Sequence, residues 1–88
     1  MIRRRVVVHG FVQGVFFRDS LRRLAERNGV AGWVRNNRDG TVEAAVEGDP
    51  ESVQRIVDYC RSGPRGAHVD RVDVYEEEAE GASGFSVR

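Results

Sequence analysis

A glycine-containing segment spanning residues 10–18 has the residue types needed to bind an anion. It reads Gly-Phe-Val-Gln-Gly-Val-Phe-Phe-Arg and leads from a predicted strand into a predicted helix. The first amides of a helix have no partners within it, and the helix dipole places partial positive charge there. Gly14 permits a tight turn, and Arg18 adds a permanent positive charge whose planar fork suits two phosphate oxygens. Together these features predict a cradle for a phosphoryl group.

The same segment also has a purely structural explanation. Turns from a strand through a glycine into a helix are common, and an arginine in the first helical turn usually faces solvent. A cation there nevertheless opposes the helix dipole unless an anion compensates for it. From the residues alone, a phosphate site and a plain turn both remain open.

Two predicted elements flank this loop. Residues 3–11 alternate with a period of two, which predicts a strand with Val6 and Val8 on one face. Residues 17–28 follow a helical period, and Asn28-Gly29 is a typical helix end. The apolar stripe of this helix contains Phe17, Leu21, Leu24, Ala25 and Asn28.

A hairpin is predicted next in the chain. Residues 30–36 and 41–47 predict two strands, and Asp39-Gly40 in the turn 37–40 is a strong hairpin signal. The alternation in the second strand places one set of residues inward and the other outward. The inward residues are Val42, Ala44 and Val46, and the outward residues are Thr41, Glu43 and Glu47.

A second helix and two more strands complete the chain. Asp49 is predicted as the N-cap of the helix and Pro50 as its first residue, and Ser62-Gly63-Pro64 ends it. Residues 68–75 and 85–87 predict the last two strands. The apolar stripe of the second helix contains Val53, Ile56, Val57 and Cys60.

The predicted order is therefore β-α-β-β-α-β plus a short terminal strand. This order is typical of the α+β class and of the ferredoxin-like split β-α-β sandwich, with a mainly antiparallel sheet and two helices on one face. In such a sheet the end of strand 30–36 can lie beside the end of strand 3–11, which would bring Asn36 near the cradle. The fold alone indicates no activity, because many unrelated functions use it.

Length and composition favour one domain over residues 1–88, with 40% hydrophobic and 32% charged residues. No apolar run reaches the ~18 residues of a membrane span, and the apolar stretch after the first arginines is too short for a signal peptide. We therefore expect a cytoplasmic protein with no membrane partner. The single cysteine, Cys60, agrees with a reducing compartment and is expected to be buried and inert.

Two segments resemble the signatures of the acylphosphatase family. Residues 10–18 match G-x-V-Q-G-V-x-F-R. Residues 32–42 read Gly-Trp-Val-Arg-Asn-Asn-Arg-Asp-Gly-Thr-Val, are followed by Gly48, and match G-[aromatic]-V-[R/K]-N-x-x-x-G-x-V with a further glycine. Both match without a gap and in the expected order, and the resemblance covers essentially the whole chain.

The resemblance implies a small, free-standing, metal-independent hydrolase that cleaves the carboxyl–phosphate bond of acyl phosphates and needs no cofactor. Arg18 would bind the phosphate together with backbone amides of the loop, and Asn36 would orient the attacking water. The amides are those of Val12, Gln13, Gly14, Val15, Phe16 and Phe17.

This chemistry explains why so few residues suffice. The leaving carboxylate has a conjugate acid with a pKa of roughly 4, so it departs without a general acid. Phosphoryl transfer depends mostly on positioning and charge stabilisation, and a phosphate oxygen can accept the proton of the water. We expect weak or no activity on phosphate monoesters of alcohols, whose leaving groups are poor.

Several other residues are assigned structural roles. His9 is expected on the outer face of the sheet, the acidic run Glu76–Glu80 is expected in a solvated loop, and Asn37 is expected in the turn. No Cys/His cluster suggests a metal site. Phe17 is expected in the core and Trp33 is expected to have a packing role, whereas Phe16 could either pack or touch the acyl group.

Two rival functions are considered. RNA-recognition domains share this arrangement, but they need aromatic residues on central strands, where this chain has Glu43 and Glu47. The formal net charge of +0 also provides no long-range electrostatic attraction to nucleic acid. The other rival is a phosphate-binding domain without turnover, which could dispense with Asn36. We expect a monomer that binds no nucleic acid.

Overall fold

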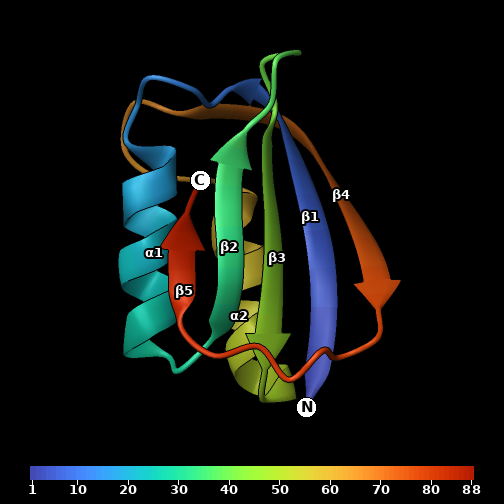
Figure 1. The fold of residues 1–88 in the computed structure, drawn as a ribbon. Coiled ribbons are helices and arrows are strands. Elements are labelled where there is room, and N and C mark those ends of the chain that lie inside the picture. Colours follow the sequence, from blue (N-terminus) through green and yellow to red (C-terminus); the bar gives the residue numbers. More distant parts are fainter.

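A five-stranded sheet with strand order β4-β1-β3-β2-β5 forms one layer of the computed structural model, which describes all 88 residues (Figure 1). Two helices lie together on one face of this sheet and form the second layer. In chain order the elements are β1 (Ile2–Phe11), α1 (Phe17–Arg27), β2 (Ala31–Asn36), β3 (Val42–Gly48), α2 (Pro50–Cys60), β4 (His68–Glu77) and β5 (Phe85–Val87).

The strand directions confirm the predicted ferredoxin-like α+β fold. β1 pairs antiparallel with β3 and with β4, and β3 pairs antiparallel with β2. The short β5 pairs parallel with β2 at the edge of the sheet. The sheet is therefore mixed and mainly antiparallel, as the order of the predicted elements indicated.

The predicted contact between the ends of the first two strands is wrong, because β3 lies between them. Asn36 of β2 pairs with Val42 of β3, and Val42 pairs with Val8 of β1. Since β1 and β2 both run antiparallel to β3, they are parallel to each other and their C-terminal ends share one edge of the sheet. That shared edge, and not direct pairing, places Asn36 on the same side of the molecule as the loop after β1.

The core lies between the sheet and the helices, and it confirms the predicted apolar stripes. Leu24 is only partly buried against this core. Burying a large apolar side chain contributes roughly 1.5–3 kcal/mol, so these contacts orient both helices on the sheet. The buried residues of the stripes are Phe17, Leu21 and Ala25 on α1 and Val53, Ile56, Val57 and Cys60 on α2.

The turn between β2 and β3 and the start of α2 lie where the sequence predicted them. One detail differs at the start of α2. Gly40 adopts a φ of 92° in the turn between β2 and β3, and the Asp39 carboxylate accepts a hydrogen bond from the Thr41 amide. Asp49 is the N-cap of α2 and Pro50 begins the helix, as predicted. The Asp49 side chain, however, makes no capping hydrogen bond.

The second face of β3 is buried too, although its residues were predicted to point outward. Thr41, Glu43 and Glu47 are each less than a tenth exposed. Arginine side chains cover the two glutamates: Arg5 and Arg35 donate to Glu43, and Arg3 donates to Glu47. Alternation identified the face correctly, but ion pairs between neighbouring strands remove it from water.

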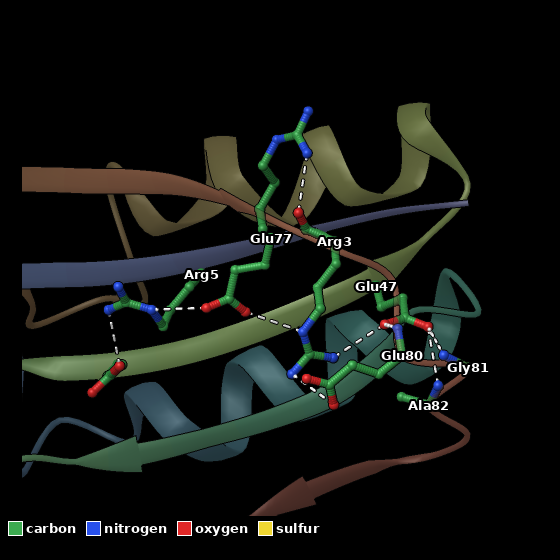
Figure 2. A network of polar contacts seen from close by, with 9 residues as sticks. Arg3, Arg5, Glu47, Glu77, Glu80, Gly81 and Ala82 are labelled. Carbon is green, nitrogen blue, oxygen red and sulfur yellow. Dashed lines mark hydrogen bonds and ion pairs between the residues drawn. The ribbon is translucent and has the colours of Figure 1, made fainter.

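The acidic run is not simply a solvated loop between the last strands. Glu76 and Glu77 belong to β4, and Glu77 accepts hydrogen bonds from both Arg3 and Arg5, each at 3.1 Å (Figure 2). Glu80 lies 3.7 Å from Arg3. The basic start of the chain and its acidic run therefore pair with each other across neighbouring strands.

Glu47 holds the connection between β4 and β5 (Figure 2). Its carboxylate accepts hydrogen bonds from the backbone amides of Glu80, Gly81 and Ala82, at 2.9, 2.9 and 3.0 Å, and from Arg3 at 3.1 Å. The amide of Glu80 lowers the pKa of the Glu47 carboxyl, and the other donors add to this effect against the opposing effect of burial. Glu47 is therefore an ionised anchor for the segment that leads into β5.

Candidate active site

The loop between β1 and α1 has an unusual backbone. Gly14 adopts a φ of 76°, which glycine accepts without strain, as the sequence predicted. Phe16 adopts a φ of 61° in the left-handed region, the only residue other than glycine to have a positive φ. A bulky side chain in this conformation is uncommon, and such strain concentrates at functional sites. Nothing in the sequence predicted it.

The amides of this loop have no partners within the protein. No backbone N–H of residues 12–16 donates a hydrogen bond to a backbone or side-chain acceptor. Phe16 is the N-cap of α1 and supplies no side-chain cap, so the first amides of the helix are free as well. A row of unbonded donors at the positive end of a helix favours an anion.

Arg18 projects from the first turn of α1 beside these amides. Its guanidinium forms no ion pair with a carboxylate, unlike Arg22 and Arg23 of the same helix. Its Nη1 donates to the main-chain oxygen of Arg88, 3.1 Å away. The Arg18 guanidinium is thus held by a main-chain oxygen and pairs with no aspartate or glutamate side chain.

A cavity of about 520 Å³ connects the loop with Asn36. Asn36 ends β2 and reaches this cavity because the C-terminal ends of β1 and β2 share one edge of the sheet. The structure therefore brings together the predicted arginine, the predicted asparagine and part of the predicted loop. The lining residues are Val12, Gly14, Phe16, Phe17, Arg18, Asp19, Arg22, Asn36 and Val87.

Gln13 has a structural role that the sequence did not reveal. Its side-chain Nε2 donates to the carbonyl oxygens of Asn37 at 2.7 Å and Thr41 at 2.9 Å. These carbonyls belong to the turn that directly follows Asn36. Gln13 was predicted only for its backbone amide, whereas its side chain joins the loop to the strand end that carries Asn36.

Asp19 is an acidic residue in the lining that sequence reasoning missed. It accepts hydrogen bonds from Arg22 at 2.9 Å and lies 3.0 Å from Arg23. The hydrogen bond from Arg22 lowers the pKa of the Asp19 carboxyl below its ordinary value. Asp19 therefore pairs with two neighbouring arginines and leaves Arg18 without a carboxylate side chain as a partner.

β5 contributes to the site from the end of the chain. Val87 lines the cavity, and Arg88 supplies the oxygen that Arg18 contacts. The amide of Arg88 donates to the carbonyl of Val34 in β2 at 2.8 Å, which fixes β5 beside the strand that carries Asn36. The sequence identified β5 as a strand but not as part of the site.

The residues expected to have structural roles lie outside the cavity lining, with the exception of Phe17. His9 contacts Asp73 at 2.9 Å on the sheet face opposite the helices, as predicted. Asn37 belongs to the turn, and Trp33 packs beneath the guanidinium groups of Arg35 and Arg88. Phe17 is buried in the core and also lines the cavity.

Cys60 is fully buried, and burial raises the pKa of its thiol to about 12. This agrees with the prediction of a buried, inert thiol. Side chains of His, Cys, Asp and Glu nowhere gather in groups of three or more that could hold a metal ion. Neither helix is long and apolar enough to cross a membrane.

Comparisons with known proteins point in one direction. The Acylphosphatase family model matches residues 4–87. An acylphosphatase from Rubrobacter xylanophilus is 58% identical over 96% of this chain and 77% of its own length, and one from Gloeobacter violaceus is 52% identical over 98% and 92%. The crystal structure of acylphosphatase from Bacillus subtilis superimposes with a TM-score of 0.96 at 36% identity, covering 100% of this chain and 99% of that chain.

Proposed function

The chain belongs to the acylphosphatase family, and from this premise we propose that Arg18 binds the phosphoryl group of an acyl phosphate while Asn36 orients the attacking water. As a member of this family, the protein is an enzyme that hydrolyses the carboxyl–phosphate bond of acyl phosphates. The products are a carboxylate and inorganic phosphate. The proposal concerns which residues do this and how.

The observation that carries the proposal is the set of unbonded amides beside an arginine that pairs with no aspartate or glutamate. The amides of residues 12–17 would donate to the equatorial oxygens of the phosphoryl group. Arg18 would add its charge through two parallel hydrogen bonds. These donors are fixed before the substrate arrives, so they stabilise the charge that develops on the transferring group without a cost of reorganisation.

Asn36 provides a side chain that can position the attacking water, which a site that only binds phosphate does not need. It lines the same cavity as Arg18 but comes from a different element, so it approaches from another direction. Its side-chain oxygen can accept a hydrogen bond from a water molecule and hold it in line with the bond that breaks. The water oxygen bonds to phosphorus and gives its proton to a phosphate oxygen, the P–O bond to the carboxylate breaks, and the carboxylate leaves as an anion.

The same donors account for metal-independent hydrolysis without a cofactor. One guanidinium and a row of amides provide the positive electrostatic environment that a divalent ion supplies in other phosphoryl-transfer enzymes. We expect activity to persist in the presence of EDTA.

Further proposals concern the setting of the enzyme. Residues 1–88 form one domain, in which every strand joins the same sheet. The enzyme is a cytoplasmic monomer that requires neither membrane nor nucleic acid. The single cysteine, Cys60, is buried, which supports a reducing compartment. Arginine–glutamate pairs on the open face of the sheet support a monomer.

The test is hydrolysis of benzoyl phosphate in EDTA, with inhibition by inorganic phosphate as a second measurement. Arg18→Ala should lower kcat/KM by about 10³-fold and weaken phosphate inhibition strongly, because it removes the charged donor. Asn36→Ala should lower kcat by about 10²-fold or more with phosphate inhibition unchanged, because it positions only the water.

Arg23→Ala is the matched control, since Arg23 lies on the same helix but does not line the cavity. It should keep wild-type kinetics within about twofold. A wild-type chain that binds phosphate but hydrolyses no acyl phosphate would instead support a phosphate-binding module. Equal activity in wild type and both site variants would place the reaction elsewhere.

A further inference from the structure

The cavity has two chemically different parts. The loop amides, Arg18 and Asn36 form a polar part suited to the phosphoryl group. Four apolar residues also line the cavity, but Val12 and Phe17 are almost completely buried and offer little surface. Phe16 and Val87 are 82% and 43% exposed, so they provide nearly all of its accessible apolar surface.

The cavity is larger than the phosphoryl group requires. Its volume is about 520 Å³, and a phosphoryl group bound by the loop amides fills only a fraction of it. In an acyl phosphate the carbonyl carbon is joined to phosphorus through a single oxygen. The rest of the acyl group must therefore lie at the border of the phosphate cradle, where Phe16 and Val87 are.

Phe16 is placed unfavourably for a residue with only a structural role. Its backbone lies in the left-handed region, where glycine or asparagine would be less strained, and its ring packs neither against the core nor against another aromatic ring. Exposure of the ring and strain of the backbone both disfavour the folded state. A ligand that covers the ring would offset them only when it is bound.

We propose that Phe16 and Val87 form the acyl-binding subsite of this enzyme and make it prefer acyl phosphates with a bulky apolar acyl group, aromatic or branched, over those with a small one. This inference rests on the proposed function, because the bound phosphoryl group sets where the acyl group lies. The ring of Phe16 covers one side of the acyl group from the N-cap of α1. Val87 contacts it from β5, and β5 is held beside β2 by its backbone pairing.

The two apolar side chains favour an aromatic or branched acyl group for a physical reason. Binding sites for small molecules combine apolar walls with a few placed polar groups, and an exposed aromatic ring gains most from a flat or branched apolar partner. An acetyl or carbamoyl group offers these two side chains much less apolar surface. It would use the phosphate cradle alone.

The test compares benzoyl phosphate with acetyl phosphate in the wild type, Phe16→Ala, Phe16→Leu and Val87→Ala. Phe16→Ala should lower kcat/KM for benzoyl phosphate about tenfold more than it lowers the value for acetyl phosphate, mainly through KM. Val87→Ala should act in the same direction with a smaller effect. Phe16→Leu should retain part of the preference, because it restores apolar surface.

Phe11→Ala is the matched control, because Phe11 is 64% exposed in the preceding strand but does not line the cavity. It should leave the ratio of the two substrates unchanged. Inhibition by inorganic phosphate should be the same in wild type and Val87→Ala, because Val87 lies outside the phosphate loop, and this would show that the cradle is intact.

The outcomes separate this inference from the proposed function. Hydrolysis of neither substrate by the wild type would overturn the proposed function and the subsite with it. Wild-type activity with an equal loss on both substrates in Phe16→Ala, together with weaker phosphate inhibition, would make Phe16 a structural residue of the loop. An unchanged substrate ratio in both alanine variants would leave the reaction in place and overturn the subsite.

Discussion

The side-chain amide of Gln13 donates to the carbonyl oxygen of Asn37 at 2.7 Å, across a gap of 24 positions in the sequence. A second bond from the same nitrogen reaches Thr41 at 2.9 Å. These bonds join the proposed phosphate loop to the turn that follows Asn36, the residue proposed to position the water. We expect this link to help fix the relative placement of Arg18 and Asn36.

Loss of this link should impair catalysis more than binding. We expect Gln13→Ala to lower kcat for benzoyl phosphate by about tenfold or more, because small misplacements of reacting groups are costly. The free energy of unfolding should fall by about 1–2 kcal/mol, since two carbonyls each lose one of their two donors. Kinetics and urea titration of the same preparation measure both effects.

Gln54→Ala provides the comparison for Gln13→Ala, because Gln54 bonds only to the exposed Asp58 on α2. Its activity should equal that of the wild type. Full activity in Gln13→Ala would mean that the loop and the turn hold their positions without the bridging side chain.

Acid should weaken the fold partly through Glu47. The pKa of its carboxyl is lowered in the folded state, so its ionised form stabilises the protein at pH values above the unfolded value of about 4.3. This contribution disappears as the pH falls below that value and through the lower pKa of the folded state. Glu47→Gln should therefore lower the melting temperature by several degrees at pH 7 and flatten the decline between about pH 5 and 3.

Glu78→Gln is the control for that series, since Glu78 lies in the same acidic run and forms no ion pair in the structure. Its melting curve should follow the wild type at every pH. A Glu47→Gln variant with the wild-type pH dependence would assign the acid sensitivity to other carboxylates.

The thiol of Cys60 should resist modification. With a pKa of about 12, about one thiol in ten thousand is ionised at pH 8, and burial also blocks access. We expect no reaction with iodoacetamide or Ellman's reagent within an hour in native buffer, unchanged enzyme activity, and rapid reaction after denaturation in urea. Fast labelling of the native protein, measured by mass spectrometry, would contradict the buried placement.

Asp19 should limit how tightly the product is held. Its carboxylate lines the cavity near the proposed phosphate site and neutralises Arg22. Asp19→Asn removes one negative charge, so inhibition by inorganic phosphate should strengthen on the order of fivefold. Because the pKa of Asp19 is lowered, this carboxylate stays ionised from pH 5 to 9, and the difference between the two proteins should be constant over that range.

Glu26→Gln is the control for the charge change, because Glu26 also contacts Arg22 but does not line the cavity. Its phosphate inhibition should stay within about twofold of wild type. Unchanged inhibition in Asp19→Asn would indicate that Asp19 is screened from the bound phosphate.

Much of the fold was predictable because its signals are local. Alternation located the strands, the helical period located α1 and α2, and Asp49-Pro50 marked the start of α2. Each signal depends on neighbours within a few positions, which share one strand or one helical turn. Burial of the opposite face of β3 could not be read this way, because the arginines that cover Glu43 and Glu47 come from other strands.

The sequence by itself determined the candidate site residues, since the register of two ungapped motifs selects Arg18 and Asn36. Only the tertiary structure decided how they meet. It inserted β3 between β1 and β2, tied the loop to the turn through Gln13, and brought Val87 and Arg88 to the cavity. The physical reason is that strand pairing joins segments far apart in the chain. Which side chains then meet depends on register and on sheet order, and local periodicity reports neither.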